Sequence, residues 1–147
     1  MCRLLIDTNI LLDAVIENRV ESNEACEVLD LCNGNGELGM ACALSFKDVY
    51  YITNRLYGED LARKCVDTLM GLLTIAPVDA EVCEMAFTSG EPDFEDGIIR
   101  ACAEINDADF IITRDKDAFA TSKVRSVTAA EYVRIARLRD DGKRAFA

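Results

Sequence analysis

The sequence predicts an α/β fold, a doubly wound three-layer α/β/α sandwich on a parallel sheet. Short apolar or β-branched runs alternate with segments of helical periodicity along the whole chain, which is typical of repeated βαβ units. Its 147 residues are enough for one buried core, so we expect a single domain. That domain should span residues 1–139, and residues 140–147 should form a frayed end.

The first strand is expected just before Asp7, in the apolar run at residues 4–6. A continuous apolar run is typical of a buried strand in a parallel sheet, although periodicity alone does not exclude a buried helix. In a central strand, Asp7 would lie at the carboxyl edge of the sheet, where open α/β folds bind ligands. The alternative is that Asp7 only caps the following helix.

The remaining strands and helices are predicted from local hydrophobic patterns, glycine breaks and helix N-cap residues. Four more strands are expected at residues 38–44, 73–78, 110–113 and 124–127. Helical patterns are expected at residues 9–17, 22–32, 45–57, 59–72, 80–88, 94–106 and 129–138. A glycine-rich break at residues 33–36 and Gly58 separate some of these elements. Caps are predicted at Ser45 (with Asp48 in a capping box), Asp79, Asp93 and Thr128.

Composition excludes several classes of function. The chain has no histidine, so it has no Ser-His-Asp triad, no histidine acid–base step and no ordinary zinc site. Its seven cysteines form no Cys-x-x-Cys pair, which indicates free thiols in a reducing compartment. We expect no signal peptide, because the start lacks the basic, apolar and small-residue order of one, and no apolar run approaches the roughly 20 residues needed to span a bilayer. We therefore expect a cytoplasmic protein that is not in a membrane.

The formal charge of −11, from 27 acidic and 16 basic residues, argues against broad electrostatic attraction to nucleic acid. A metal site that gathers acids, a basic partner protein or a local basic patch would reconcile this charge with a nucleic-acid ligand. The simpler alternative is a well-solvated acidic surface.

Acidic residues follow the predicted strand ends. Asp7 follows the first strand, Asp48 lies in the helix after the second, and Asp115 and Asp117 follow the fourth. Asp96 lies in the first turn of the helix before the fourth strand. Parallel strands place their carboxyl ends on one edge, so these carboxylates should converge and repel one another unless a cation lies among them. An all-carboxylate set suits Mg²⁺ or Mn²⁺.

Three segments resemble successive motifs of the PIN-domain ribonucleases, in the small prokaryotic branch that includes the VapC toxins. They are LIDTNILLD at residues 5–13, DFED at 93–96 and IITRDKDAF at 111–119. The similarity extends from residue 1 to about residue 132. It implies a five-stranded parallel sheet and a Mg²⁺- or Mn²⁺-dependent endoribonuclease acting on RNA. Such proteins are often homodimers, and an antitoxin frequently inhibits them.

Carried over by position, the resemblance implies that Asp7, Asp96 and Asp115 are catalytic metal ligands and that Asp117 is a supplementary acid. Asp48 is assigned to the catalytic set, although the family usually has a glutamate there. In the implied mechanism, the metal activates a water molecule for attack on the phosphate. Asp96 or Asp115 would orient that water. Capping remains the alternative for Asp48, and a helix start for Asp117.

Other positions also match the family. Thr8, Asn9 and Thr113 correspond to polar residues that hold the acids or a water molecule, and Gly97 stands where alanine is common. For Asp13 and Asp93 we favour a capping or solvated role. Basic residues near the predicted rim are candidates for contacts with RNA phosphates, although an ordinary solvated face explains each of them as well: Lys47, Arg55, Arg114 and Lys116.

Two other functions remain open. One is a phosphatase of the haloacid dehalogenase type with Asp7 as nucleophile, but such an enzyme needs a second aspartate where this chain has Asn9. The other is a catalytically degenerate PIN fold that binds RNA or protein, which the acidic surface and the short Asp48 side chain would suit.

A homodimer is also expected, because several side chains of the predicted helices at residues 45–72 are apolar, although these may equally be core: Tyr50, Tyr51, Leu56 and Leu61.

Overall fold

The computed structural model describes residues 1–90 and 93–145. Within these residues, five parallel strands form one sheet in the order β3-β2-β1-β4-β5. The strands are β1 (Arg3–Ile6), β2 (Leu38–Cys42), β3 (Thr74–Ala76), β4 (Phe110–Ile112) and β5 (Arg125–Val127). The predicted five-stranded parallel sheet is therefore confirmed, and β3 lies at one edge.

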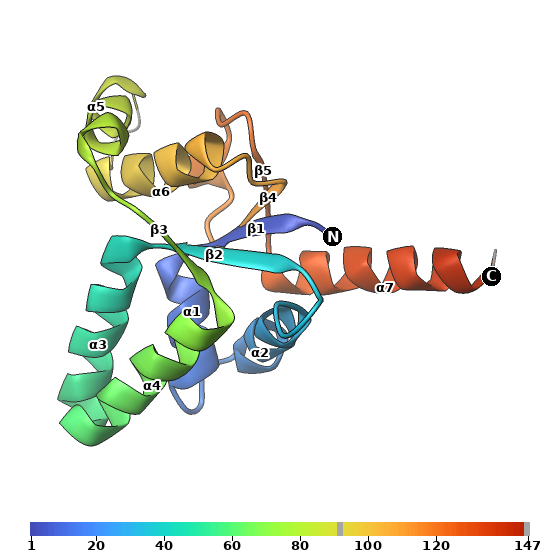
Figure 1. Ribbon diagram of the computed structural model, residues 1–147, viewed down its shortest axis with the longest axis horizontal. Coiled ribbons are helices and arrows are strands. Elements are labelled where there is room, and N and C mark those ends of the chain that lie inside the picture. Colours follow the sequence, from blue (N-terminus) through green and yellow to red (C-terminus); the bar gives the residue numbers. More distant parts are fainter. Residues whose placement is uncertain (91–92, 146–147) are drawn as a thin grey trace.

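Helices cover both faces of the sheet (Figure 1). They are α1 (Thr8–Val15), α2 (Ser22–Leu31), α3 (Ala43–Tyr57), α4 (Glu59–Leu72), α5 (Ala80–Thr88), α6 (Phe94–Ile105) and α7 (Ala129–Ala145). Helices α5 and α6 lie on one face, and the other helices lie on the opposite face. This arrangement is the predicted three-layer sandwich. None of the described helices is long and apolar enough to cross a membrane.

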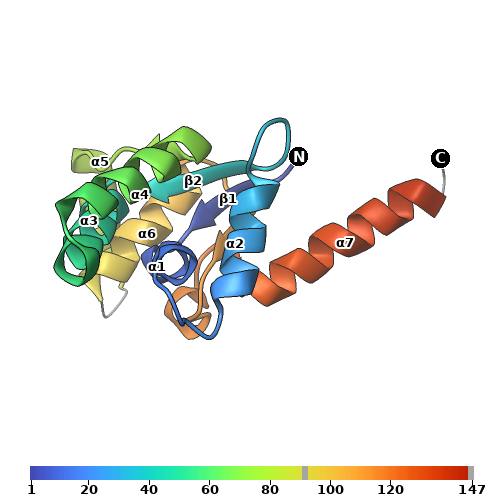
Figure 2. The same ribbon diagram turned by 90° about the horizontal axis from the view of Figure 1, so that it is seen from below.

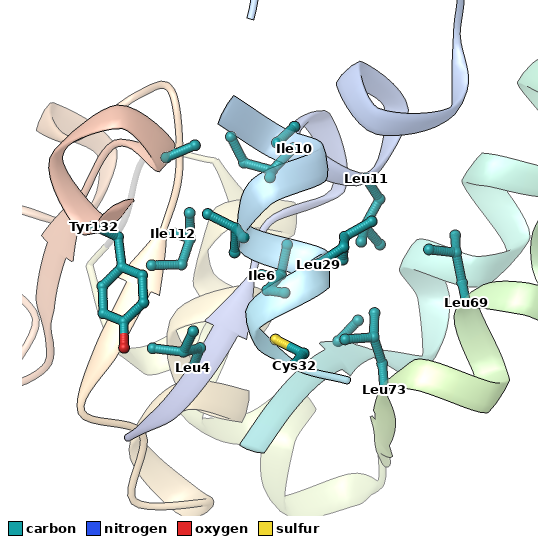
Figure 3. Close-up of a cluster of buried hydrophobic side chains, with 14 of the residues drawn as sticks. Leu4, Ile6, Ile10, Leu11, Leu29, Cys32, Leu69, Leu73, Ile112 and Tyr132 are labelled. Carbon is teal, nitrogen blue, oxygen red and sulfur yellow. The ribbon is translucent and has the colours of Figure 1, made fainter. Parts of the chain in front are cut away.

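The central strand β1 supplies both halves of the core. Successive side chains of a strand point to opposite faces of its sheet. Accordingly, Leu4 and Ile6 pack into the cluster shared by α1, α2 and α7 (Figure 3), whereas Leu5 joins the cluster under α5 and α6. Because β1 pairs with β2 on one side and β4 on the other, the residue after β1 lies at the middle of the carboxyl edge.

The start of α3 differs from the prediction. The helix begins at Ala43, and the N-cap residue is Cys42. Ser45 is not a cap: it is buried inside the helix, and its hydroxyl lies 2.7 Å from the Thr8 hydroxyl. Alanine and leucine at positions 43 and 44 favour the helix, so it starts two residues early. The predicted capping box with Asp48 is therefore wrong.

The end of α7 also differs. Residues 140–145 continue this helix, whereas the sequence suggested a frayed end; residues 146 and 147 lie outside the described residues. Lys143 and Arg144 in the last turn are favourable next to the negative end of the helix dipole. The far half of α7 extends past the body of the domain (Figures 1 and 2).

Gly97 allows α6 to pack closely on α5. A Cβ atom at this position would lie 2.9 Å from the carbonyl oxygen of Ala86. We expect Gly97→Ala to destabilise the protein by about 1 kcal/mol in urea unfolding, because overpacking outweighs the gain in helix propensity.

Gly71 in α4 provides the matched control, since a Cβ there meets nothing within 4 Å. Gly71→Ala should stabilise the protein by roughly 0.5–1 kcal/mol. Equal stabilisation by both substitutions would contradict the packing explanation.

Candidate active site

A cleft of about 410 Å³ opens at the carboxyl edge of the sheet. Among the described residues, six carboxylates line it: Asp7, Asp48, Asp93, Glu95, Asp96 and Asp115. The structure thus brings together four of the five predicted acids. The fifth, Asp117, is exposed at the start of the short 3₁₀ helix η1 (Asp117–Phe119) and does not line this cleft. It occupies the helix start that was its alternative interpretation.

Asp7 is the most buried acid of the cleft, with 8% of its surface exposed. Its Oδ1 accepts a hydrogen bond from the Thr8 N–H at 2.8 Å, and its Oδ2 accepts one from the Thr113 hydroxyl at 2.8 Å. Asp7 is also the N-cap residue of α1, so the capping interpretation is confirmed alongside its place in the cleft. Burial raises the pKa of Asp7, against the opposing effect of the two hydrogen bonds.

Thr113 connects two acids of the cleft. Its hydroxyl donates to Asp7 and accepts from the backbone N–H of Asp115 at 3.0 Å. Its own N–H is bonded to the Val127 carbonyl, which continues the sheet pairing beyond β4. The side chain that orients Asp7 therefore also fixes the start of the loop that carries Asp115.

Asp96 lies in the first turn of α6. Asp93 is the N-cap of this helix, as predicted, and accepts hydrogen bonds from the N–H groups of Glu95 and Asp96. Burial, and then the negative charges of Asp93, Asp7, Asp115 and Glu95, raise the pKa of Asp96 to about 6. The cleft therefore concentrates negative charge that nearby cations offset only in part.

Sequence reasoning missed Glu95, which lines the cleft. Burial, and then the charges of Asp48, Asp93 and Asp7, raise its pKa. The signal was available in the acidic run at residues 93–96, but position alone does not tell which of two adjacent helical residues faces the cleft.

Arg114, a candidate for a phosphate contact, is held by a buried acid. Its Nε lies 3.3 Å from Oδ2 of Asp13, which is 1% exposed and also 3.8 Å from Arg19. The capping or solvated role favoured for Asp13 is therefore wrong. A carboxylate this deeply buried needs a cationic partner, and the two arginines supply it.

The other candidate cations differ in their partners. Lys116 pairs with Glu131 at 2.8 Å, and Lys47 pairs with Asp48 at 2.8 Å. The Arg55 guanidinium instead lies over an aromatic ring of the same helix. Two of these three cations are thus already engaged with carboxylates.

The predicted polar residues Thr8 and Asn9 also line the cleft, beside Leu12 and three side chains of α3, one of which is Asp48. The Thr8 hydroxyl is hydrogen-bonded to Ser45, which joins the start of α1 to α3. The end of β1, α1 and α3 are therefore connected at the floor of the site.

The sequence matches the family described as "PIN domain" over residues 3–117, which is most of the chain. This chain belongs to the PIN-domain family. The matched residues include Asp7, Asp48, Asp96 and Asp115, which come together in the cleft. No curated protein matches the sequence. The PIN-domain match does not support the haloacid dehalogenase alternative.

Solved structures share the fold of this PIN domain. VapC20 of Mycobacterium tuberculosis, a toxin that cleaves the sarcin–ricin loop, is 15% identical, with 80% of this chain and 93% of VapC20 covered and a TM-score of 0.64. A toxin–antitoxin complex of Klebsiella pneumoniae gives 22% identity, coverages of 86% and 97%, and a TM-score of 0.66. DNA-bound VapBC of Salmonella typhimurium is 14% identical, with 88% of this chain and 99% of that chain covered and a TM-score of 0.67. At these identities the likeness shows the fold.

The donor set of this PIN domain suits a hard divalent cation, because its charged groups are carboxylates and the chain has no histidine. Within residues 1–90 and 93–145, no three acidic, cysteine or histidine side chains are grouped closely enough to hold an ion. Burial nevertheless raises the pKa values of Asp7, Glu95 and Asp96, and the charges of neighbouring acids raise those of Glu95 and Asp96 further, which a cation would offset.

Proposed function

We propose that this PIN domain is an endoribonuclease that requires Mg²⁺ or Mn²⁺ and hydrolyses RNA phosphodiesters. The observation that carries the proposal is the convergence of Asp7, Asp96 and Asp115 in one cleft, with the pKa of Asp96 raised to about 6 by burial and by its acidic neighbours. These three carboxylates would hold the cation in part through its bound water molecules, because no three of the described acids are close enough to ligate it directly. When bound, the cation supplies a Lewis acid for the phosphate and lowers the pKa of water.

The protein's own groups prepare the site in three ways. Thr113 and the Thr8 N–H fix the orientation of the Asp7 carboxylate. The N-cap Asp93 fixes the first turn of α6, and with it Asp96. Asp96, as a carboxylate at neutral pH, would accept a hydrogen bond from the attacking water and orient it toward the phosphate.

Metal-dependent RNA cleavage tests this proposal. We expect the purified protein to cleave labelled RNA in Mn²⁺ and to lose all cleavage in EDTA, because uncompensated carboxylates repel the phosphate. Asp7→Asn should be inactive in Mn²⁺. Asp67→Asn, which removes an exposed acid of α4 outside the cleft, should retain full activity.

Absence of cleavage in Mn²⁺ would contradict the proposal and favour the degenerate binding module. Phosphate release from small phosphate esters without RNA cleavage would favour a phosphatase instead.

We further propose that a basic antitoxin protein binds and inhibits this nuclease. The formal charge of −11 suits a basic partner, and several structures with this fold were solved as toxin–antitoxin complexes. A small basic protein encoded directly upstream should co-purify with this chain and block RNA cleavage. Unchanged cleavage in the presence of that protein would count against this partner. The cytoplasmic location remains a prediction.

A homodimer is part of the same proposal. Leu56 and Leu61, near the turn between α3 and α4, are exposed and do not belong to the core. Exposed apolar side chains of this size suit a contact with a second copy. Sedimentation velocity should show a dimer that Leu56→Asp weakens, and a monomeric wild-type protein would contradict the proposal.

A further inference from the structure

One face of α3 extends the candidate site beyond its carboxylates. Asp48, Tyr51, Ile52 and Arg55 have the spacing i, i+3, i+4 and i+7, which places them on one face of a helix. The first three of these side chains line the cleft. Along this face, the Asp48 carboxylate is followed by the Tyr51 ring and then by the Arg55 guanidinium.

Tyr51 is an aromatic side chain displayed in the cleft wall. It is 59% exposed, whereas Val49 and Thr53 of the same helix are buried in the core. The Arg55 guanidinium lies 5.8 Å from the centroid of its ring, which is within the range of a cation–π interaction. Tyr51 thus contributes little to the core, and much of its surface is open to a ligand.

Arg55 differs from the other basic side chains near the cleft. Lys47, Arg114 and Lys116 each have a carboxylate partner. Among the contacts of residues 1–90 and 93–145, Arg55 has only the Tyr51 ring. A guanidinium without a carboxylate partner keeps its N–H donors for a phosphate, which it binds in a bidentate manner.

We propose that Tyr51 and Arg55 bind an unpaired nucleotide of the substrate next to the cleavage site, with its base stacked on the Tyr51 ring and its phosphate at the Arg55 guanidinium. This inference rests on the proposed ribonuclease function and assigns the nucleotide next to the cleaved bond to these two side chains. In a duplex, neighbouring base pairs cover the faces of each base, so only an unpaired base can stack on a side chain.

Steady-state cleavage of a labelled RNA oligonucleotide, alone and annealed to its complement, tests the proposal. We expect the single strand to be cleaved and the duplex to be cleaved at least about tenfold more slowly. Tyr51→Ala should raise KM about tenfold, the effect of losing one base–aromatic stack, with kcat little changed. Tyr51→Phe should behave like the wild type, and Tyr51→Leu like Tyr51→Ala, because leucine has no aromatic face.

Arg55 is tested in the same assay. Arg55→Ala should raise KM, and Arg55→Lys should restore only part of the loss, because lysine keeps the charge but not the planar donors. Phe87→Ala is the matched control: Phe87 is an 81% exposed aromatic of α5 outside the cleft, so its loss should leave KM unchanged.

A binding measurement separates this proposal from the ribonuclease proposal. Asp96→Asn is mixed in Mn²⁺ with a single strand containing 2-aminopurine, whose fluorescence falls on stacking. Quenching that disappears in Asp96→Asn/Tyr51→Leu supports the nucleotide site even if the wild type cleaves no RNA. Equal quenching by Asp96→Asn and by the double variant overturns the proposal. An unchanged KM for Tyr51→Ala also overturns it. A wild-type KM combined with loss of a dimer would assign Tyr51 to a contact between copies.

Discussion

Asp96→Asn should abolish RNA cleavage and, at the same time, stabilise the metal-free protein. We expect activity in Mn²⁺ to fall by at least about 100-fold, since even the loss of a residue that supports a metal ligand costs about 10–100-fold. The Tm of the metal-free variant at pH 7.5 should rise by about 2–4 °C, the shift that 1 kcal/mol gives in a domain of this size. Asparagine has the shape of aspartate but removes a charge that its four acidic neighbours repel.

The pH dependence of stability follows from the same carboxyl. The pKa of Asp96 is about 6 in the folded protein against an ordinary value of 3.8, so folding disfavours its charged form. Above pH 6 the penalty is fully present, and below about pH 4 the group is protonated in both states and the penalty is absent. The Tm of the metal-free wild type should therefore rise as the pH falls from 7 to 5, because protonation of Asp96 removes this penalty.

The variant provides the comparison for that titration. Asp96→Asn should show a smaller rise in Tm between pH 7 and pH 5 than the wild type, and Asp67→Asn should follow the wild type. Burial raises the pKa values of Asp7 and Glu95 in the same direction, so some rise should remain in the variant. A lower Tm for metal-free Asp96→Asn at pH 7.5 would show that repulsion among these acids is not significant.

Thr113→Val should reduce both activity and stability. The substitution keeps the shape of the side chain but removes the hydroxyl that donates to Asp7 and accepts from the Asp115 N–H. Leaving these buried groups unpaired should cost about 1–3 kcal/mol in urea unfolding. Cleavage should fall about 10–100-fold, the usual effect of losing a residue that orients a metal ligand.

Thr113→Ser is the matched control, since serine retains the hydroxyl. It should keep most of the activity and lose only the stability that the methyl group contributes. If Thr113→Val cleaved RNA within about twofold of the wild-type rate, the Asp7 carboxylate would not depend on Thr113 for its orientation.

The order and type of the elements could be predicted because their signals are local. The helix predicted at residues 59–72 is α4 (Glu59–Leu72), since Gly58 marks its start and a β-branched run follows it. The start of α3 was predicted wrongly because the contact that decides it is not local. The Ser45 hydroxyl pairs with Thr8, which is distant in the sequence, so the local cap pattern was misleading.

The site could be predicted as far as topology determines it. Acids at the ends of parallel strands must meet at one edge, and Asp7 and Asp115 do so. The loop after β4 was harder to predict, because Asp117 begins the short 3₁₀ helix η1 and does not line the cleft. The pairing of Arg114 with Asp13 was also unpredictable, because it depends on how α1 packs beneath that loop.

The position of β1 between β2 and β4 has a consequence for synthesis of the chain. Asp7 leaves the ribosome early, but β4 and the Thr113 hydroxyl that orients the Asp7 carboxylate are made about a hundred residues later. Domains fold as units during translation, so a nascent chain that ends before Asp115 has an incomplete central sheet and only part of the cleft. Unfinished translation products would therefore lack the hydrolytic activity proposed for the finished protein.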